Sequence, residues 1–155
     1  MNFPIVFEIP YPPGKGKREW NQRFGLNAYY TGKHYAQRKK DAEELHWLAA
    51  VCMKRARIKK ELTHEPVEIR FFWDDNLDCD NHAVIGKAVV DAMMGYLLPD
   101  DNRRWFRKVS HEFWDGKKIR VEIWPWKENR HEKAAQHGPD QGAPGGTHWA
   151  QGATW

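Results

Sequence analysis

The chain has 155 residues, and 25 lysines and arginines against 21 aspartates and glutamates give it a formal net charge of +4. This length fits one domain and excludes a multidomain enzyme. Hydrophobic residues make up 41% of the chain, while a mean hydropathy of −0.86 and the lack of an apolar run near ~20 residues exclude a membrane protein. Two cysteines, Cys52 and Cys79, are too few for a disulfide framework, and no secretory signal is recognisable, so we expect a cytoplasmic protein.

The first half of the chain alternates between strand and helix patterns. Alternating apolar residues predict a strand over residues 5–9, near a sheet edge because Pro12 and Pro13 follow it. Residues 15–30 mix basic and aromatic side chains without a clear period, so we predict a loop there. Apolar residues at steps of three or four predict a long helix over residues 33–59, and renewed alternation predicts a strand over residues 67–73.

The second half begins with an acidic loop over residues 74–80. An apolar repeat then predicts a second helix over residues 81–96. Two β-rich runs, 105–113 and 119–124, flank Asp115-Gly116, which predicts a hairpin. The resulting order, β-α-β-α-β-β, predicts a single small α/β (α+β) domain over residues 1–126, with helices packed on a mixed sheet. The Gly-rich residues 127–155 carry few aliphatic side chains, which predicts a disordered tail.

The charges are unevenly distributed along the chain. The net charge is +9 over residues 14–60, −6 over residues 74–101 and +5 over residues 102–130. A basic surface around carboxylates is what a metal-dependent enzyme acting on a polyanion needs, because cations hold phosphates and a divalent ion lets carboxylates face them. The same charges also fit solvated helix faces and acidic loops, so both interpretations stay open.

The acidic island contains a candidate site. Asp78 and Asp80 are two residues apart, so on an extended segment both carboxylates point to one side, a suitable pair for a hard divalent cation. At about 100° per residue, Asp80, Lys87 and Asp91 would share one helix face. The carboxylates would hold Mg²⁺ or Mn²⁺, and Lys87 would steady the phosphate under attack.

Each residue also has a purely structural explanation. Asp80 or Asn81 would cap the helix N-terminus, and Lys87 and Asp91 would form an exposed ion pair. The Asp100-Asp101-Asn102 run would be a turn. The joint arrangement favours the functional interpretation.

The same residues resemble those of a known family. The pattern Asp-x-Asp-Asn, Lys-x-x-x-Asp-Ala and Asp-Asp, found here at residues 78–81, 87–92 and 100–101, is similar to that of the RusA family of phage-derived Holliday junction resolvases. The resemblance covers about residues 3–125. It implies a homodimeric, Mg²⁺-dependent endonuclease that resolves four-way DNA junctions in recombination and repair.

The resemblance also implies residue roles. Asp78, Asp80 and Asp101 would be metal ligands, and Lys87 would be the catalytic lysine beside them. Asn81, Asp91 and Asp100 would have supporting roles. Positive charge for the DNA would come from Lys15, Lys17, Arg18, Arg23, Arg103, Arg104, Arg107 and Lys108. Two other functions remain open: a non-catalytic protein that binds branched DNA, and a metal-dependent hydrolase of another nucleic acid.

Overall fold

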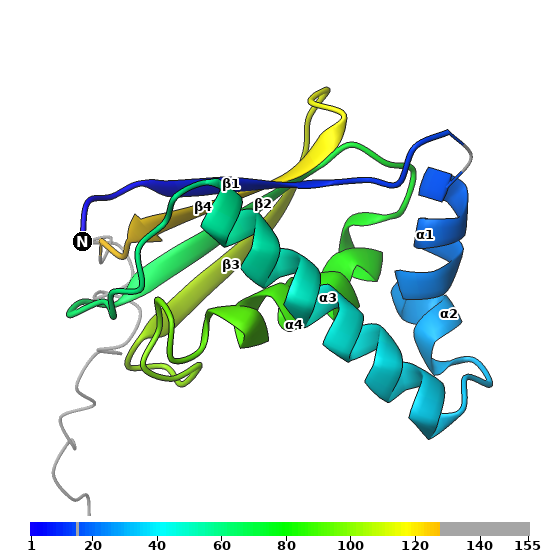
Figure 1. The fold of residues 1–155 in the computed structure, drawn as a ribbon, viewed down its shortest axis with the longest axis horizontal. Coiled ribbons are helices and arrows are strands. Elements are labelled where there is room, and N and C mark those ends of the chain that lie inside the picture. The colour runs from blue at the N-terminus through cyan, green and yellow to red at the C-terminus, as the bar shows by residue number, and fades with distance from the viewer. Residues whose placement is uncertain (15, 128–155) are drawn as a thin grey trace, which may run out of the picture.

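A four-stranded sheet carries helices on one face (Figure 1) in the computed structural model, which describes residues 1–14 and 16–127. The strands are β1 (Ile5–Pro10), β2 (Val67–Trp73), β3 (Phe106–Phe113) and β4 (Lys118–Pro125). The helices are α1 (Gly16–Phe24), α2 (Leu26–Tyr30), α3 (Tyr35–Arg55) and α4 (Ala83–Met93), and the 3₁₀ turn η1 (Cys79–His82) leads into α4. The predicted α+β class with a mixed sheet is confirmed.

The sheet has the order β1-β4-β2-β3. β2 runs parallel to β3 and antiparallel to β4, and β1 is antiparallel to β4. The predicted edge position of β1 is therefore confirmed. β2 is central, and Val67, Ile69, Phe71 and Trp73 are fully buried, because alternate residues of a strand point to the same face and this face meets the helices.

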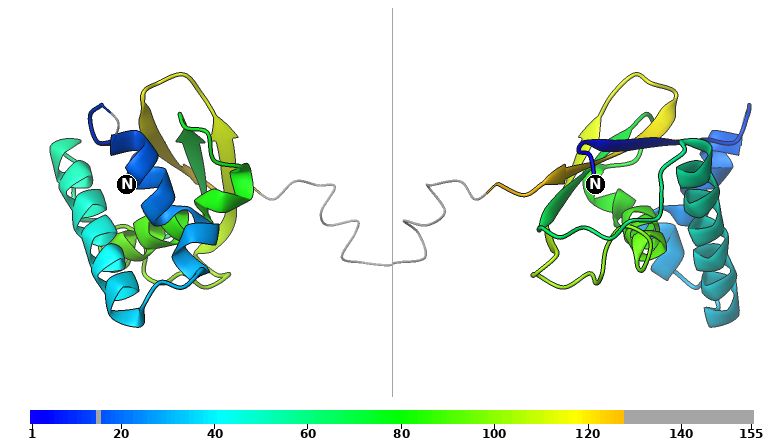
Figure 2. Two further views of the ribbon diagram at one scale, coloured as in Figure 1. Left: turned by 90° about the vertical axis from the view of Figure 1, so that its right-hand side faces the viewer. Right: turned by 60° about the vertical axis from the view of Figure 1, so that its left-hand side comes forward.

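The helix layer is formed by α3 and α4, which pack against each other beside the same face of the sheet (Figure 2). Leu45 and Ala49 from α3 and Ile85, Val89 and Met93 from α4 are buried in the common core. Burying one of the larger of these side chains, such as Leu45 or Ile85, contributes roughly 1.5–3 kcal/mol relative to leaving it exposed. The buried stripe of α4 fixes which of its residues face outward.

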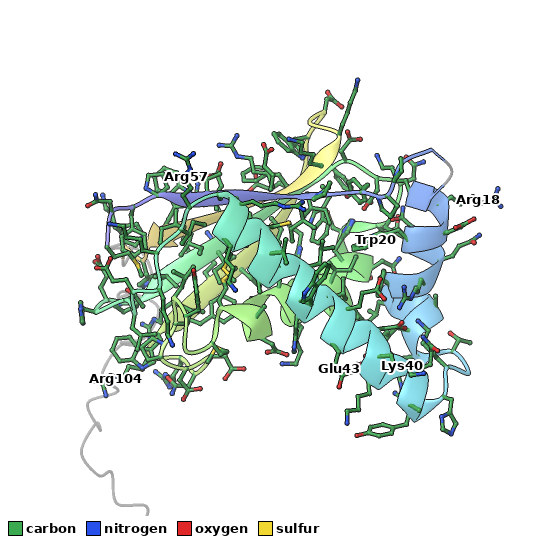
Figure 3. The ribbon with its side chains drawn as sticks, in the orientation of Figure 1. Arg18, Trp20, Lys40, Glu43, Arg57 and Arg104 are labelled. Atoms are coloured by element: carbon green, nitrogen blue, oxygen red, sulfur yellow. The ribbon has the colours of Figure 1, made fainter. Side chains whose placement is uncertain are left out.

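The loop predicted for residues 15–30 is wrong, because α1 and α2 occupy this segment. Trp20 and Phe24, one helical turn apart, are buried with ring centroids 4.5 Å apart. Trp20 points from α1 toward the core (Figure 3). A helix this short shows too few turns for a period, and its stability comes from tertiary packing.

The hairpin predicted around Asp115-Gly116 is also wrong. β2 lies between β3 and β4, so these two strands do not pair. The connection instead crosses the end of β2, where the Trp114 amide donates to the Trp73 carbonyl at 3.0 Å and the Lys117 amide donates to the Asp74 carboxylate. A hairpin would leave β2, the most buried strand, with an unpaired edge, and the inserted position satisfies both of its edges.

Across the described residues, no helix combines the length and apolar character needed to cross a membrane. The predicted tail lies outside the described residues except for Lys127.

Candidate functional site

The acidic loop after β2 divides into a paired half and an unpaired half. In the paired half, Asp75 is buried and binds the Tyr11 hydroxyl at 2.8 Å and His82 Nε2 at 2.8 Å. Burial alone would raise the pKa of Asp75, but the hydrogen bonds from His82 and Tyr11 outweigh it and hold the pKa below its usual value. Asp74 binds Lys17 at 3.0 Å. These two carboxylates fix the loop.

The unpaired half contains Asp78 and Asp80, both exposed. Within residues 1–14 and 16–127 neither carboxylate forms an ion pair or a side-chain hydrogen bond that the structure records. The capping explanation is wrong: α4 begins at Ala83 with His82 as its N-cap, so neither Asp80 nor Asn81, which lie in η1, caps this helix. The side chains of Asp78 and Asp80 have no structural partner in the described chain.

Lys87 and Asp91 lie on the outward face of α4, as the helical period predicted. Lys87 Nζ donates to Asp91 Oδ1 at 3.0 Å, and His46 Nε2 of α3 lies 3.9 Å from Asp91 Oδ2. The hydrogen bond to Asp91 raises the pKa of Lys87. Lys87 therefore carries its proton at neutral pH. Asp80 lies in η1, outside the regular helix, so the predicted helical phase does not apply to it.

The two neighbouring aspartates in the turn before β3, Asp100 and Asp101, have different surroundings. Asp100 accepts the Asp101 amide at 2.8 Å and the Asn102 side chain, so it holds the turn, as the structural explanation predicted. The Asp101 carboxylate has no recorded partner among the described residues and is exposed. Asp101 is thereby left available for a ligand.

A groove between α4 and β3 brings several of these residues together. Lys87, Asp91 and Asp101 line a cavity of about 280 Å³, closed on the strand side by Val109 and His111. We call it the α4–β3 groove. Cys79 Sγ contacts the His111 carbonyl at 3.6 Å, so the segment that carries Asp78 and Asp80 adjoins the groove through η1.

The predicted metal ligands fit a hard cation in chemical type but are not assembled as a ligand set. Carboxylates suit Mg²⁺, and those of Asp78, Asp80 and Asp101 are exposed and uncommitted. In the described part of the chain, however, no three His, Cys, Asp or Glu side chains form a group that could hold a metal ion. The ligand assignment therefore stays a prediction.

The predicted DNA-binding residues are spread over the molecule. Arg103, Arg104 and Arg107 are exposed beside Asp101, whereas Lys108 lies 3.8 Å from Glu68. Arg18 projects from α1 and Arg104 from the turn before β3, on opposite sides of the molecule (Figure 3).

Two of the predicted DNA-binding residues form ion pairs with carboxylates of the fold. Arg23 binds Asp41 and Glu44 and so joins α1 to α3, and Lys17 binds Asp74. Lys15 lies outside the described residues.

Two histidines near the groove were not predicted. His82 is buried and stacks on Trp73 with ring centroids 4.0 Å apart, while His111 stacks on Phe71 at 5.4 Å. Burial lowers the pKa of His111. No local spacing identifies either residue, because their positions depend on strand register and on the fold of the acidic loop.

Comparison of the chain with protein-family models and with curated protein sequences finds no match in either case.

Proposed function

We propose that this chain is a divalent-cation-dependent endonuclease that cuts branched DNA, with the four-way junction as its substrate. The α4–β3 groove is the observation that carries the proposal, because it places a protonated lysine, Lys87, beside the uncommitted carboxylate of Asp101 in one cavity. The resemblance to the RusA family, whose pattern includes both residues, supports the same function.

In this proposal, Asp78, Asp80 and Asp101 hold the cation. A bound Mg²⁺ would act as a Lewis acid and neutralise charge that develops on the attacked phosphate. Lys87 offers its ammonium group to that phosphate, and Asp91 orients it through the 3.0 Å hydrogen bond.

The surrounding cations support a polyanionic substrate. Arg103, Arg104 and Arg107 are exposed next to Asp101, and in the described chain no ion pair involves any of them. Exposed, unpaired arginines bind phosphate oxygens well, since the guanidinium group presents several donors in a fixed plane.

We also propose a homodimer, because a symmetric junction offers two equivalent strands and C₂ pairing is the commonest assembly. Sedimentation of the chain with and without a junction checks the oligomeric state.

The decisive experiment is cleavage of a synthetic four-way junction by the full chain with Mg²⁺ or with EDTA. We expect nicking only with Mg²⁺. We expect Asp80→Asn and Asp101→Asn to lose at least about a hundredfold in cleavage rate. The loss of a residue that only orients a metal ligand already costs about 10–100-fold, and these residues would be ligands themselves. Both variants should bind the junction as well as the parent or better, because each loses a negative charge.

The matched control is Asp115→Asn, which removes an exposed carboxylate from the turn before β4 and should leave the rate unchanged. Tight junction binding without nicking at any protein excess would favour a non-catalytic DNA-binding protein. Preferred cleavage of single-stranded RNA at fixed Mg²⁺ would favour a hydrolase of another nucleic acid.

A further inference from the structure

A second cavity lies on the other side of the acidic loop. It has a volume of about 760 Å³ and is lined by α1, by α2 and by residues 76–81. We call it the amide cleft, because five carboxamide side chains line it: Asn21, Gln22, Asn27, Asn76 and Asn81. Its size is in the range of sites that hold small molecules and cofactors.

The walls of the amide cleft are held in place by the paired carboxylates. Asp41 of α3 binds Arg23 of α1, and Lys33 reaches both Asp41 and the Arg23 carbonyl. On the opposite wall, Asp75 binds Tyr11 and accepts the Leu77 amide at 3.0 Å. A cleft with fixed walls loses little entropy when it binds a ligand.

Gly25 lets the two walls meet closely. A Cβ at this position would lie 2.8 Å from the Asn21 carbonyl oxygen and 3.4 Å from Leu77 Cδ2. The bare backbone of Gly25 thus allows the junction of α1 and α2 to pack against Leu77. Together with Ala28, Leu77 supplies apolar surface inside the cleft.

The lining chemistry suits a nucleobase. A base has apolar faces and edges that carry both donors and acceptors, and a carboxamide offers a donor and an acceptor on one group. None of the residues that line the cleft is a carboxylate. Asn21 lines the cleft, and its side-chain oxygen has no hydrogen-bond partner among the described residues.

The position of the cleft relates it to the candidate site. Asn81 directly follows Asp80, so the loop that carries the predicted metal ligands also forms one wall of the cleft. Arg18 lines the same cleft and is exposed, where it can meet a phosphate at the mouth.

We propose that the amide cleft binds one nucleotide from the branch point of the DNA that is unpaired in the complex, with the base inside and a phosphate near Arg18. This inference rests on the proposed function and names the part of the substrate that lies beside the carboxylates.

The test uses the full chain in EDTA, where cleavage plays no part. The probe is a four-way junction with 2-aminopurine at the branch point, or a single strand that carries the same base, and its fluorescence reports whether that base is stacked. We expect a saturable change on binding that a fully paired duplex of the same length does not show.

Two variants probe the cleft by different means. Gln22→Ala combined with Asn27→Ala removes two exposed carboxamides, and we expect it to weaken the binding detected by 2-aminopurine by roughly tenfold, since good base contacts discriminate by factors of this order. Asn76→Trp, at an exposed loop position, fills the cleft and should abolish the fluorescence change. Asn2→Ala, an exposed carboxamide outside the cleft, is the control.

An unchanged fluorescence response in both cleft variants would overturn the inference, as would an equal loss in Asn2→Ala. Failure of the proposed function is a different result: no nicking with Mg²⁺, whatever the fluorescence shows. A fluorescence response that is lost in the cleft variants supports the inference even where the parent shows no nicking with Mg²⁺.

Discussion

Two groups of aspartates in this molecule have the same chemistry and opposite surroundings. Asp41 and Asp75 are buried and each accepts several hydrogen bonds, from Arg23, Lys33 and Gln37 in one case and from Tyr11, His82 and the Leu77 amide in the other. Asp78, Asp80 and Asp101 are exposed and have no recorded partner among the described residues. The first group holds elements together, and the second contributes nothing of that kind.

The difference shows which carboxylates are available for a ligand. A buried carboxylate without partners is costly, so pairing at Asp41 and Asp75 is what folding requires. Exposed carboxylates need no partner, and Asp78, Asp80 and Asp101 belong to a segment of net charge −6. A bound cation would offset that negative charge, and this is the reason to seek function among the unpaired group.

The largest expected effect on stability comes from breaking the paired group at Asp41. We expect Asp41→Asn to lower the free energy of unfolding by roughly 3 kcal/mol, because it removes the charge that compensates Arg23 and Lys33. Denaturant unfolding followed by circular dichroism measures the loss. Glu43→Gln, at an exposed position of the same helix, is the control and should change stability by less than about 0.5 kcal/mol.

The dependence of the unfolding free energy on pH provides a second test of Asp41. Burial would raise the pKa of Asp41, but hydrogen bonds from Lys33, Arg23 and Gln37 hold the pKa below its usual value. Its contribution is thus complete above the unfolded pKa of about 3.9 and is lost as pH falls through the lower folded value. Equal acid sensitivity in Asp41→Asn and the parent would contradict this role.

Much of the fold was predictable because residue period alone decides which face of an element is buried. The alternation at residues 67–73 predicted β2, and the spacing of apolar residues predicted α3 and α4 to within a few residues. Pairing between distant segments was not predictable. Asp115-Gly116 is a common hairpin sequence, and nothing local shows that β2 inserts between β3 and β4.

The candidate site was predictable to a similar extent. The helical period placed Lys87 and Asp91 on one face, and their 3.0 Å contact confirms it. The approach of Asp101 depends on the path of the chain after α4, which spacing does not reveal. Asp75 and Asp78 look alike in the sequence, and only burial against Tyr11 and His82 separates their roles.

A smaller loss is expected at Asp75, the other paired carboxylate. Tyr11→Phe removes the hydroxyl that donates at 2.8 Å and leaves the buried Asp75 with one donor fewer. We expect a loss of about 1–3 kcal/mol in the free energy of unfolding, measured by denaturant titration. Tyr35→Phe, at an exposed tyrosine, should have no measurable effect, and an equal loss in both variants would refute a specific role for the Tyr11 hydroxyl.

The unpaired group should respond in the opposite way. In EDTA, we expect Asp78→Asn and Asp101→Asn to change the free energy of unfolding by less than about 0.5 kcal/mol or to raise it slightly, because they remove repulsion and no contact. In the parent, Mg²⁺ should raise the melting temperature in a concentration-dependent way. Both variants should lose that rise, and a rise retained in full would remove these residues from the ligand set.

The smallest effect is expected at His111, a residue of β3 that lines the α4–β3 groove. Its ring stacks on Phe71, and its Nδ1 accepts the Trp73 indole N–H at 3.1 Å. Burial, and then the charge of His82, lower its pKa, so the fold favours the neutral ring. The unfolded chain binds a proton from about pH 6.5 downward while the folded chain does not. Stability should therefore fall as pH drops below about 6.5 and level off below the folded pKa. His111→Phe should flatten this part of the stability profile, measured by denaturant titrations between pH 5 and 8. In this range the low pKa of Asp75 keeps that carboxylate ionised. An unchanged profile would assign the pH dependence to another group.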